Sequence, residues 1–253
     1  MLFLQIKMFS IFNKKVYITD YLVGLTDMHC HVLPGIDDGA KDNAMSLEML
    51  KQYRSLGYKG TIATPHIMED YYDNTTSKVQ NTLSAFEIYK NENGFSDFKI
   101  SAASEYMLDQ QFERLTAEED LLPIFGDNIL VEMSYFQKPI HVDVMLFDLQ
   151  VKGFKPILAH PERYQYLKGI DEILEFKKKG SDLQLNLLSL GGHYGTEAQK
   201  TAFNLLENNH YNYLGTDAHK PEHFQVLKNI SIAKKMILNF EKLIASTKDN
   251  INA

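Results

Sequence analysis

Short hydrophobic runs alternate along this chain with longer segments in which apolar residues recur at helical spacing. Seven of the runs are bounded by glycine or polar clusters and are long enough for one buried strand each. They cover residues 24–29, 60–64, 98–105, 128–133, 155–160, 182–186 and 212–217. The pattern predicts seven strands, each followed by a connecting segment.

Helix signals fill the intervals between the predicted strands. Asp42 can cap a helix that Gly57 ends, and Pro139 suits the first turn of another. The expected helices cover residues 42–56, 75–90, 139–151, 171–179, 195–209 and 221–248. Strands that alternate with helices pair in parallel through crossover connections, so the sequence predicts an α/β fold.

The length of 253 residues suits one α/β domain, which we place at 24–253 after an N-terminal extension at 1–23. The first twelve residues are apolar, but Lys7 interrupts them and a membrane span needs about 20. No basic start or small-residue cleavage site marks a signal peptide. We expect a helix or an extended start there, without stable membrane insertion; Met8 is an alternative initiator.

The charge balance narrows the classes of partner. A net charge of −7 and a pI near 5.7 leave no general basic field for nucleic acid, although a local basic patch stays open. Cys30 is the single cysteine, so no disulfide can form within the chain. A reducing, cytoplasmic location is the simpler expectation.

Imidazole and carboxylate side chains gather where the predicted strands end. His29 and His31 are two residues apart, so their side chains share one face of the first strand. Asp37 and Asp38 follow in the loop after this strand. Later strand ends carry His66, Glu105, Glu132, His160, Asp217 and His219. The first and last of these would lie far apart in an open sheet, but they converge at the mouth of a barrel. We therefore favour a closed or distorted β/α barrel.

Each of these residues also has a purely structural interpretation. Glu105 could cap a helix, Asp217 could form a turn, and His66 could be a packed loop histidine. Nine such candidates at one end of successive strands, with the adjacent Asp37 and Asp38 counted as one, are hard to obtain by chance. The four remaining histidines are assigned to surface or packing roles: His141, His193, His210 and His223.

The number of candidate ligands predicts more than one metal. One catalytic ion needs about three protein ligands and a water, so nine candidates suggest two or three divalent ions. Nitrogen and oxygen ligands without thiolate suit manganese, iron, cobalt or zinc. Adjacent metals suit hydrolysis at phosphorus. A cysteine phosphatase is excluded, because it needs an arginine six positions after its nucleophile, where Cys30 is followed by Ile36.

The motifs carry a family resemblance over residues 25–245. The opening Asp-Met-His-Cys-His-Val-Leu-Pro-Gly-Ile-Asp-Asp-Gly-Ala-Lys-Asp, and then Thr-Pro-His, Val-Glu-Met-Ser, Ala-His-Pro-Glu-Arg-Tyr and Thr-Asp-Ala-His, resemble those of the CpsB/CapC tyrosine phosphatases. That family belongs to the polymerase and histidinol phosphatase (PHP) superfamily. The resemblance implies a distorted (β/α)7 TIM-like barrel in one domain. It also implies a three-metal site, with manganese foremost.

The resemblance also implies an activity and roles for residues. The expected enzyme is a phosphoric monoester hydrolase that removes phosphate from tyrosines of a membrane-associated capsule or exopolysaccharide kinase, by attack of a metal-bridging hydroxide. The implied ligands are His29, His31, Asp38, His66, Glu105, Glu132, His160, Asp217 and His219. Arg163 would grip the phosphate and act in catalysis with Asp217 and His219. Asp37 is expected to support its loop.

Some positions depart from the family pattern. Arginines expected after His66 are replaced by Ile67-Met68-Glu69-Asp70, and Lys220 follows the last metal motif in place of an arginine. Tyr71 and Tyr72 either frame an aromatic substrate or lie on the surface.

Three alternative functions stay open. One is a phosphatase for small molecules such as histidinol phosphate, and a second is a non-catalytic metal-binding partner of a kinase complex. A polymerase-associated nuclease suits an acidic chain less well.

Overall fold

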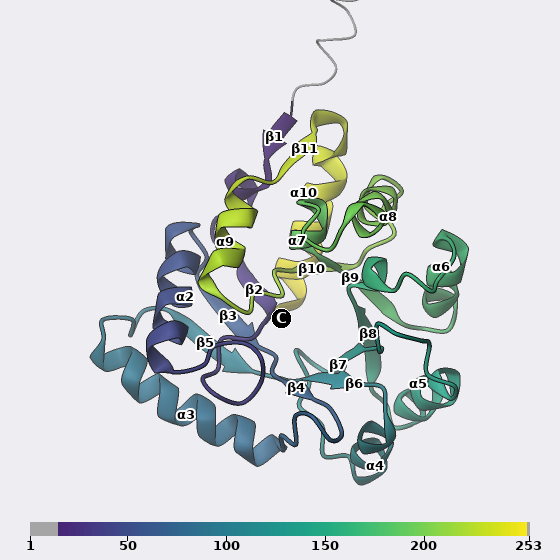
Figure 1. Cartoon of the computed structure of the whole chain (residues 1–253), viewed down its shortest axis with the longest axis horizontal. Coiled ribbons are helices and arrows are strands. Elements are labelled where there is room, and N and C mark those ends of the chain that lie inside the picture. The colour runs from purple at the N-terminus through teal and green to yellow at the C-terminus, as the bar shows by residue number, and fades with distance from the viewer. Residues whose placement is uncertain (1–14, 252–253) are drawn as a thin grey trace, which may run out of the picture.

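The structure is a computed structural model that describes residues 15–251. Seven parallel β-segments form a ring, with helices around its outside (Figure 1). The strands are β2 (Thr26–Cys30), β3 (Gly60–Ala63) with β4 (His66–Ile67), β5 (Lys99–Ala102) with β6 (Glu105–Met107), β7 (Asn128–Glu132), β8 (Lys155–Ala159), β9 (Asp182–Asn186) and β10 (Tyr213–Gly215).

Backbone hydrogen bonds at two places join the three-stranded sheet β2-β3-β5 to the six-stranded sheet β10-β9-β8-β7-β6-β4. On one side the amide of Ala103 donates to the carbonyl of Ala63 at 2.8 Å, which links the paired segments. On the other, the Asp217 amide donates to the His29 carbonyl at 2.8 Å, and the His31 amide donates to the Ala218 carbonyl at 3.0 Å. The ring therefore closes at the C-terminal ends of its strands.

The barrel is distorted because two of its strands are interrupted. Each is broken for two residues, at 64–65 and at 103–104, and β5 pairs only with β3 whereas β6 pairs with β4 and β7. The predicted α/β fold with a parallel, distorted barrel is confirmed. The single strand expected at 98–105 is corrected to two short ones.

The helices pack around the ring in chain order. They are α2 (Asn43–Ser55), α3 (Thr76–Glu92), α4 (Gln110–Glu118), α5 (Val142–Val151), α6 (Ile170–Lys178), the short α7 (Leu187–Leu190), α8 (Thr196–Glu207), α9 (Pro221–Lys228) and α10 (Ile237–Ile251). Side chains of Asp42, Thr75 and Asp109 cap the first three by accepting an amide hydrogen bond from three residues on.

Two apolar clusters hold the fold together. The larger lies between the ring and the helices, and the smaller fills the ring with Met28, Ile62, Leu130 and Ile157 among its members. Ile251, the last residue of α10, packs against this smaller cluster. The barrel is thus a packed core, and the C-terminal helix helps to fill it.

One helix prediction was wrong, and two helices, α4 and the short α7, were not predicted. The expected helix at 221–248 is two helices separated by β11 (Ser231–Ala233), because Ile230 and Ile232 alternate into the core as a strand does. Helix α4 was not predicted, although Asp109 provides its cap. The other expected helices are present with ends shifted by a few residues.

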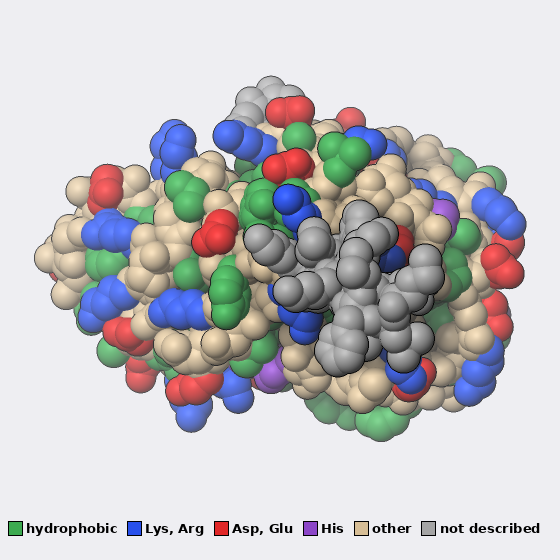
Figure 2. All heavy atoms as spheres, turned by 90° about the horizontal axis from the view of Figure 1, so that it is seen from above, with side chains coloured by type: hydrophobic (Ala, Val, Ile, Leu, Met, Phe, Trp, Pro, Cys, Tyr) green, Lys and Arg blue, Asp and Glu red, His purple; other side chains and the backbone are tan. Residues whose placement is uncertain are grey.

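The first described residues pack onto the domain. Strand β1 (Lys15–Tyr17) pairs with β11, and Ile18 of the 3-10 turn η1 (Ile18–Tyr21) is fully buried, as is Leu22. The apolar start predicted within residues 1–12 lies outside the described residues. No helix within 15–251 is long and apolar enough to cross a membrane. On the face seen in Figure 2, basic and acidic side chains lie interspersed.

Candidate metal centre

The side chains predicted at the strand ends meet at one mouth of the ring. Eight of them form three groups in which one ligand atom from each residue lies within 4.8 Å of the others. The inner group is His29, His31, Glu105 and Asp217; the side group is His66, Glu105 and Glu132; the rim group is His31, Asp38, His66 and His219. Each pair of groups shares one residue, so the three groups adjoin one another.

The inner group is fully enclosed. His29 Nε2 lies 3.2 Å from Glu105 Oε2 and 3.4 Å from Asp217 Oδ1. His31 Nε2 lies 3.3 Å from the same Asp217 oxygen. His29 lies in β2, His31 directly follows it, Glu105 begins β6, and Asp217 lies in the loop after β10; the ring closure brings these segments together.

The residues of the side group lie on three neighbouring strands, β4, β6 and β7. His66 Nδ1 lies 2.9 Å from Glu132 Oε1 and 3.1 Å from Glu105 Oε2. His160 Nε2 contacts the other Glu105 oxygen at 2.9 Å. His160 lies outside the three compact groups, so its direct role as a ligand stays a prediction.

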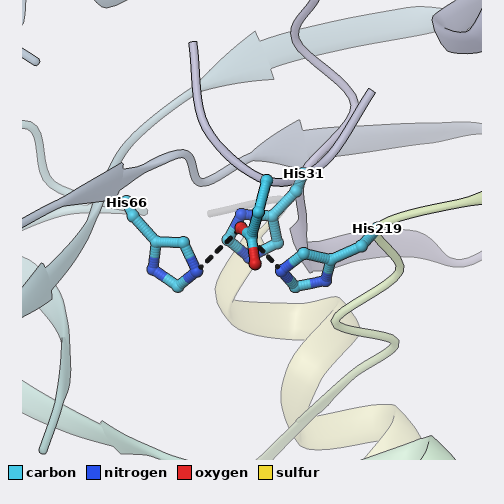
Figure 3. Close-up of side chains that lie close together, drawn as sticks. His31, His66 and His219 are labelled. Carbon is cyan, nitrogen blue, oxygen red and sulfur yellow. Dashed lines mark ion pairs between the residues drawn. The ribbon is translucent and has the colours of Figure 1, made fainter. Parts of the chain in front are cut away.

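The rim group is the most exposed of the three. Asp38 Oδ1 lies 3.5 Å from His66 Nε2 and 3.4 Å from His219 Nε2, and the side chain of Asp38 is 54% exposed. His31 and His219 stack with ring centroids 3.8 Å apart. Figure 3 shows the three imidazoles turned toward one another around these ion pairs.

Outer hydrogen bonds set the orientation of the inner histidines. His31 Nδ1 lies 2.8 Å from Asp37 Oδ2, and His29 Nδ1 lies 3.2 Å from Gln184 Oε1. With Nδ1 occupied, Nε2 of each ring faces the centre, as in histidine ligands backed by an outer acceptor. Asp37 also accepts the Gly39 amide at 2.9 Å, so it holds its loop as well as a ring. Gln184 was not predicted, since nothing local marks its partner 155 residues away.

Burial and the neighbouring charges shift the pKa values of these buried groups in opposite directions. Burial alone would raise the pKa of Glu105, but the nearby His29 and His66 hold that pKa well below its usual value. Burial would lower the pKa of His29, but Glu105 and Asp217 raise it. The lowered pKa favours the ionised form of Glu105, which is the state that binds a cation.

Unpartnered polar atoms show that the residues fit metal ions. Among the described residues, fourteen buried side-chain polar atoms make no hydrogen bond, and five of them gather at this mouth: Glu105 Oε2, Glu132 Oε1, Asp217 Oδ1, His66 Nδ1 and His160 Nδ1. Leaving such atoms unpaired is costly, and all five belong to the predicted ligands. Oxygen and imidazole donors directed at common points suit divalent transition metals.

Arg163 lies directly beside the inner group. It ends the 3-10 turn η2 (Pro161–Arg163), and its NH1 donates to Asp217 Oδ2 at 2.8 Å. Glu162 anchors that turn from the other side, because its carboxylate accepts hydrogen bonds from Ser189 Oγ at 2.7 Å and Tyr211 OH at 2.9 Å. The site thus combines anionic metal-binding groups with one guanidinium at its edge.

Two tyrosines that the sequence did not single out flank the guanidinium. The Cζ atom of Arg163 lies 4.4 Å from the ring centroid of Tyr135 and 3.9 Å from that of Tyr194. Both come from loops, after β7 and after α7, where no periodicity indicates which way a side chain points.

Cys30 is a packed residue behind the site. It is fully buried, and its Sγ lies 2.8 Å from Thr61 Oγ1. Burial raises the pKa of the thiol to about 12, so it stays protonated at neutral pH. A thiolate nucleophile is incompatible with this environment.

The remaining predicted positions lie at or near the mouth. The Tyr72 ring stacks on His66 with centroids 5.5 Å apart, whereas Tyr71 is exposed. Lys220 is exposed at the start of α9. His223 packs behind the rim group and accepts the His219 amide through Nδ1 at 3.2 Å.

A ring of parallel strands with histidines and carboxylates at its C-terminal mouth defines a barrel of the metal-dependent hydrolase class. The chain belongs to the capsular polysaccharide synthesis family CpsB/CapC, whose sequence model matches residues 25–237. The family resemblance seen in the motifs is confirmed.

Characterised relatives support this assignment. The chain is 29% identical over 217 residues to the tyrosine-protein phosphatase YwqE of Bacillus subtilis, covering 83% of this chain and 84% of that one. It is 28% identical to the putative tyrosine-protein phosphatase CapC of Staphylococcus aureus, covering 87% and 85%.

Solved structures agree with the fold. A chain from the crystal structures of YwqE and of CpsB from Streptococcus pneumoniae, described as unique metal-dependent tyrosine phosphatases, superposes with a TM-score of 0.72 at 26% identity. That match covers 88% of this chain and 95% of the other. The lactonase Lmo2620 from Listeria monocytogenes matches with a TM-score of 0.53 at 13% identity, over 94% and 97% of the chains, and shows likeness of fold alone.

Proposed function

We propose that this chain is a metal-dependent phosphatase that hydrolyses phosphotyrosine in proteins. The observation that carries the proposal is the set of three adjoining ligand groups, each pair sharing one residue, beside the Arg163 guanidinium. The relatives are tyrosine-protein phosphatases, which supports phosphotyrosine as the substrate class. The family description supports a tyrosine kinase of capsule or exopolysaccharide synthesis as the partner.

The ligand groups support two or three divalent ions. Nine nitrogen and oxygen donors without thiolate favour manganese, with iron, cobalt or zinc as alternatives. Bound metals would activate water for attack on phosphorus and neutralise charge on the phosphate oxygens. The lone buried thiol is compatible with a reducing, cytoplasmic location.

The chain's own residues would divide the remaining work. Arg163 would donate hydrogen bonds to phosphate oxygens, because the N–H groups of its guanidinium lie in one plane and match the spacing of these oxygens. Asp217 would bind metal and orient the arginine at the same time. Its Oδ1 faces the histidines, and its Oδ2 accepts a hydrogen bond from Arg163. His219, partly exposed at the rim, would act in catalysis through the metal that it helps to hold, and the departing phenolate, with a pKa near ~10, demands little help from a proton donor.

Matched substrates test the proposal. Metal-loaded protein should hydrolyse a phosphotyrosine peptide faster than histidinol phosphate, and p-nitrophenyl phosphate should also be turned over. His29→Ala should abolish all three activities, because it removes an inner ligand. Preference for histidinol phosphate would favour the small-molecule alternative, and turnover that survives in His29→Ala would overturn the site assignment.

Iodoacetate provides the control for mechanism. The protein should keep full activity after treatment, since Cys30 is buried and protonated. Inactivation by iodoacetate together with resistance to chelation would contradict a metal-dependent reaction.

A further inference from the structure

Arg163 is the residue to which the proposed function assigns phosphate binding. The chain has three arginines, and the other two are engaged elsewhere: Arg54 pairs with Asp97, and Arg114 pairs with Glu69. A single guanidinium must therefore be held in place by its surroundings.

Two aromatic rings from separate loops provide this support. Tyr135 follows β7, Tyr194 follows α7, and their ring centroids lie 4.4 Å and 3.9 Å from Arg163 Cζ. A guanidinium over an aromatic face is attracted electrostatically, and the attraction grows when water is excluded. The side chain of Arg163 is only 16% exposed, so both contacts are largely shielded.

The tyrosine hydroxyls tie the same rings to the metal-binding carboxylates. Tyr194 OH donates to Asp217 Oδ2 at 3.3 Å and accepts from Asn186 Nδ2 at 3.0 Å. Tyr135 OH donates to Glu132 Oε2 at 3.4 Å. Each ring is thus held at one end by a hydrogen bond while its face contacts the guanidinium.

We propose that Tyr135 and Tyr194 are positioning residues that clamp Arg163 so that the free edge of its guanidinium faces the phosphate. A stacked guanidinium donates only in its own plane, and NH1 is already committed to Asp217. The rings limit rotation of the side chain, so the donor edge is oriented before substrate arrives. Binding then costs less conformational entropy. This inference rests on the proposed function for its ligand, a phosphate monoester.

The first test is structural and requires neither metal nor turnover. With three arginines in the chain, the Arg163 Nε–H signal can be assigned in an NMR spectrum by its loss in Arg163→Lys. Ring currents should move this signal upfield. The shift should diminish in Tyr135→Leu and in Tyr194→Leu and persist in the two Tyr→Phe variants. An unshifted signal in the wild type would overturn the clamp.

The second test measures binding of inorganic phosphate to the metal-loaded protein by calorimetry. Each Tyr→Leu variant should weaken binding about tenfold, and each Tyr→Phe variant should stay within about threefold of the wild type. In an Arg163→Lys background the Tyr→Leu changes should cost little more, because the rings act through the arginine. Tyr17→Leu, an exposed tyrosine on β1, is the matched control.

The outcomes separate this inference from the proposed function. Equal losses in both backgrounds, or Tyr→Phe losses as large as those of Tyr→Leu, would overturn the clamp while leaving the phosphatase intact. A clamp that behaves as expected in a protein without phosphotyrosine turnover would overturn only the function. Tyr135 is 41% exposed, so its variants keep the test valid if Tyr194→Leu fails to fold.

Discussion

At the scale of single residues, the candidate ligands differ in whether they belong to one or to two of the three ligand groups. Glu105 belongs to both the inner and the side group and is fully buried, whereas Asp38 belongs to the rim group alone and is half exposed. A residue shared by two groups has no substitute when its charge is removed. Loss of a carboxylate should therefore cost more at Glu105 than at Asp38.

The matched pair Glu105→Gln and Asp38→Asn tests this difference. Elemental analysis after dialysis should show that Glu105→Gln loses more than one metal per chain, and Asp38→Asn at most one. Outer partners of ligands typically change affinity by about 10–100-fold, and direct ligands should exceed that. Equal metal loss from both variants would contradict the shared position of Glu105.

The buried thiol of Cys30 predicts how the free energy of unfolding depends on pH. Burial raises its pKa in the folded protein to about 12, while an unfolded thiol titrates near ~8.5. Between these values the unfolded chain loses the proton first, so the thiol's contribution to stability is complete below about pH 8.5 and is lost as pH rises toward 12.

Urea unfolding of the wild type and of Cys30→Ala would measure this effect. Raising the pH from 8 to 10 should lower the wild-type free energy of unfolding by about 2 kcal/mol more than that of the variant. Phosphatase activity should be retained in Cys30→Ala. A constant difference between the two proteins across this range would contradict the raised pKa.

Most of the candidate ligands could be predicted from the sequence because each follows a strand directly. His29 and His31 alternate on one strand, and Glu105 and Glu132 lie at the start or end of a strand. Tyr135, Tyr194 and Gln184 could not be predicted. Their contacts depend on loop conformation or on strand neighbours far away in sequence, which local patterns do not encode.

At the scale of elements, the C-terminal end of helix α3 holds a buried lysine that binds the carbonyls of the following loop. Lys90 is 2% exposed, and its Nζ donates to the carbonyls of Phe98 at 2.7 Å and Phe95 at 3.1 Å. Its amine also pairs with Glu87 at 3.1 Å. The ammonium group thus ties together the segment that returns from α3 to β5, where the Phe95 carbonyl also accepts the Phe98 amide at 3.1 Å.

Replacing this lysine should destabilise the protein. Lys90→Met keeps the apolar stem but removes both hydrogen bonds of the amine, and the Phe98 carbonyl loses its side-chain donor, which should lower the free energy of unfolding by about 2 kcal/mol. Lys78→Met, on the exposed side of the same helix, should change it by less than about 0.5 kcal/mol. Denaturant unfolding measures both, and equal effects would show that the buried amine contributes nothing specific.

Elements were predicted well where one pattern governed a whole segment and poorly where two patterns met. The helices at 43–55 and 76–92 have a capping residue and a steady helical period. Residues 229–233 lie between two helical segments, so the short β11 was absorbed into one predicted helix. Its partner β1 lies more than 200 residues away, and only the tertiary structure shows the pairing.

At the scale of the whole molecule, metal binding and barrel closure depend on the same strands. The hydrogen bonds that join β2 to the segment after β10 involve the backbone of His29, His31 and Asp217, whose side chains form the inner group. A bound cation would pair atoms that are buried without partners. Ligands that bind only the folded state stabilise it in proportion to their occupancy.

Chelation should therefore lower the thermal stability of the protein. At metal concentrations of about 100 times the dissociation constant, one ion contributes about 2.7 kcal/mol. The melting temperature should fall by several degrees after treatment with a chelator and recover on addition of manganese. A melting temperature independent of metal would contradict the coupling of the site to the fold.

The central claim is that three adjoining ligand groups at the barrel mouth hold the metals that make this chain a phosphotyrosine phosphatase. Titration of metal-stripped protein with manganese, with bound metal and hydrolysis of a phosphotyrosine peptide measured in the same samples, tests it most directly. We predict no turnover without metal, and activity that rises with occupancy and reaches its maximum at two or three ions per chain. Full turnover by the stripped protein, or full occupancy without turnover, would contradict the account.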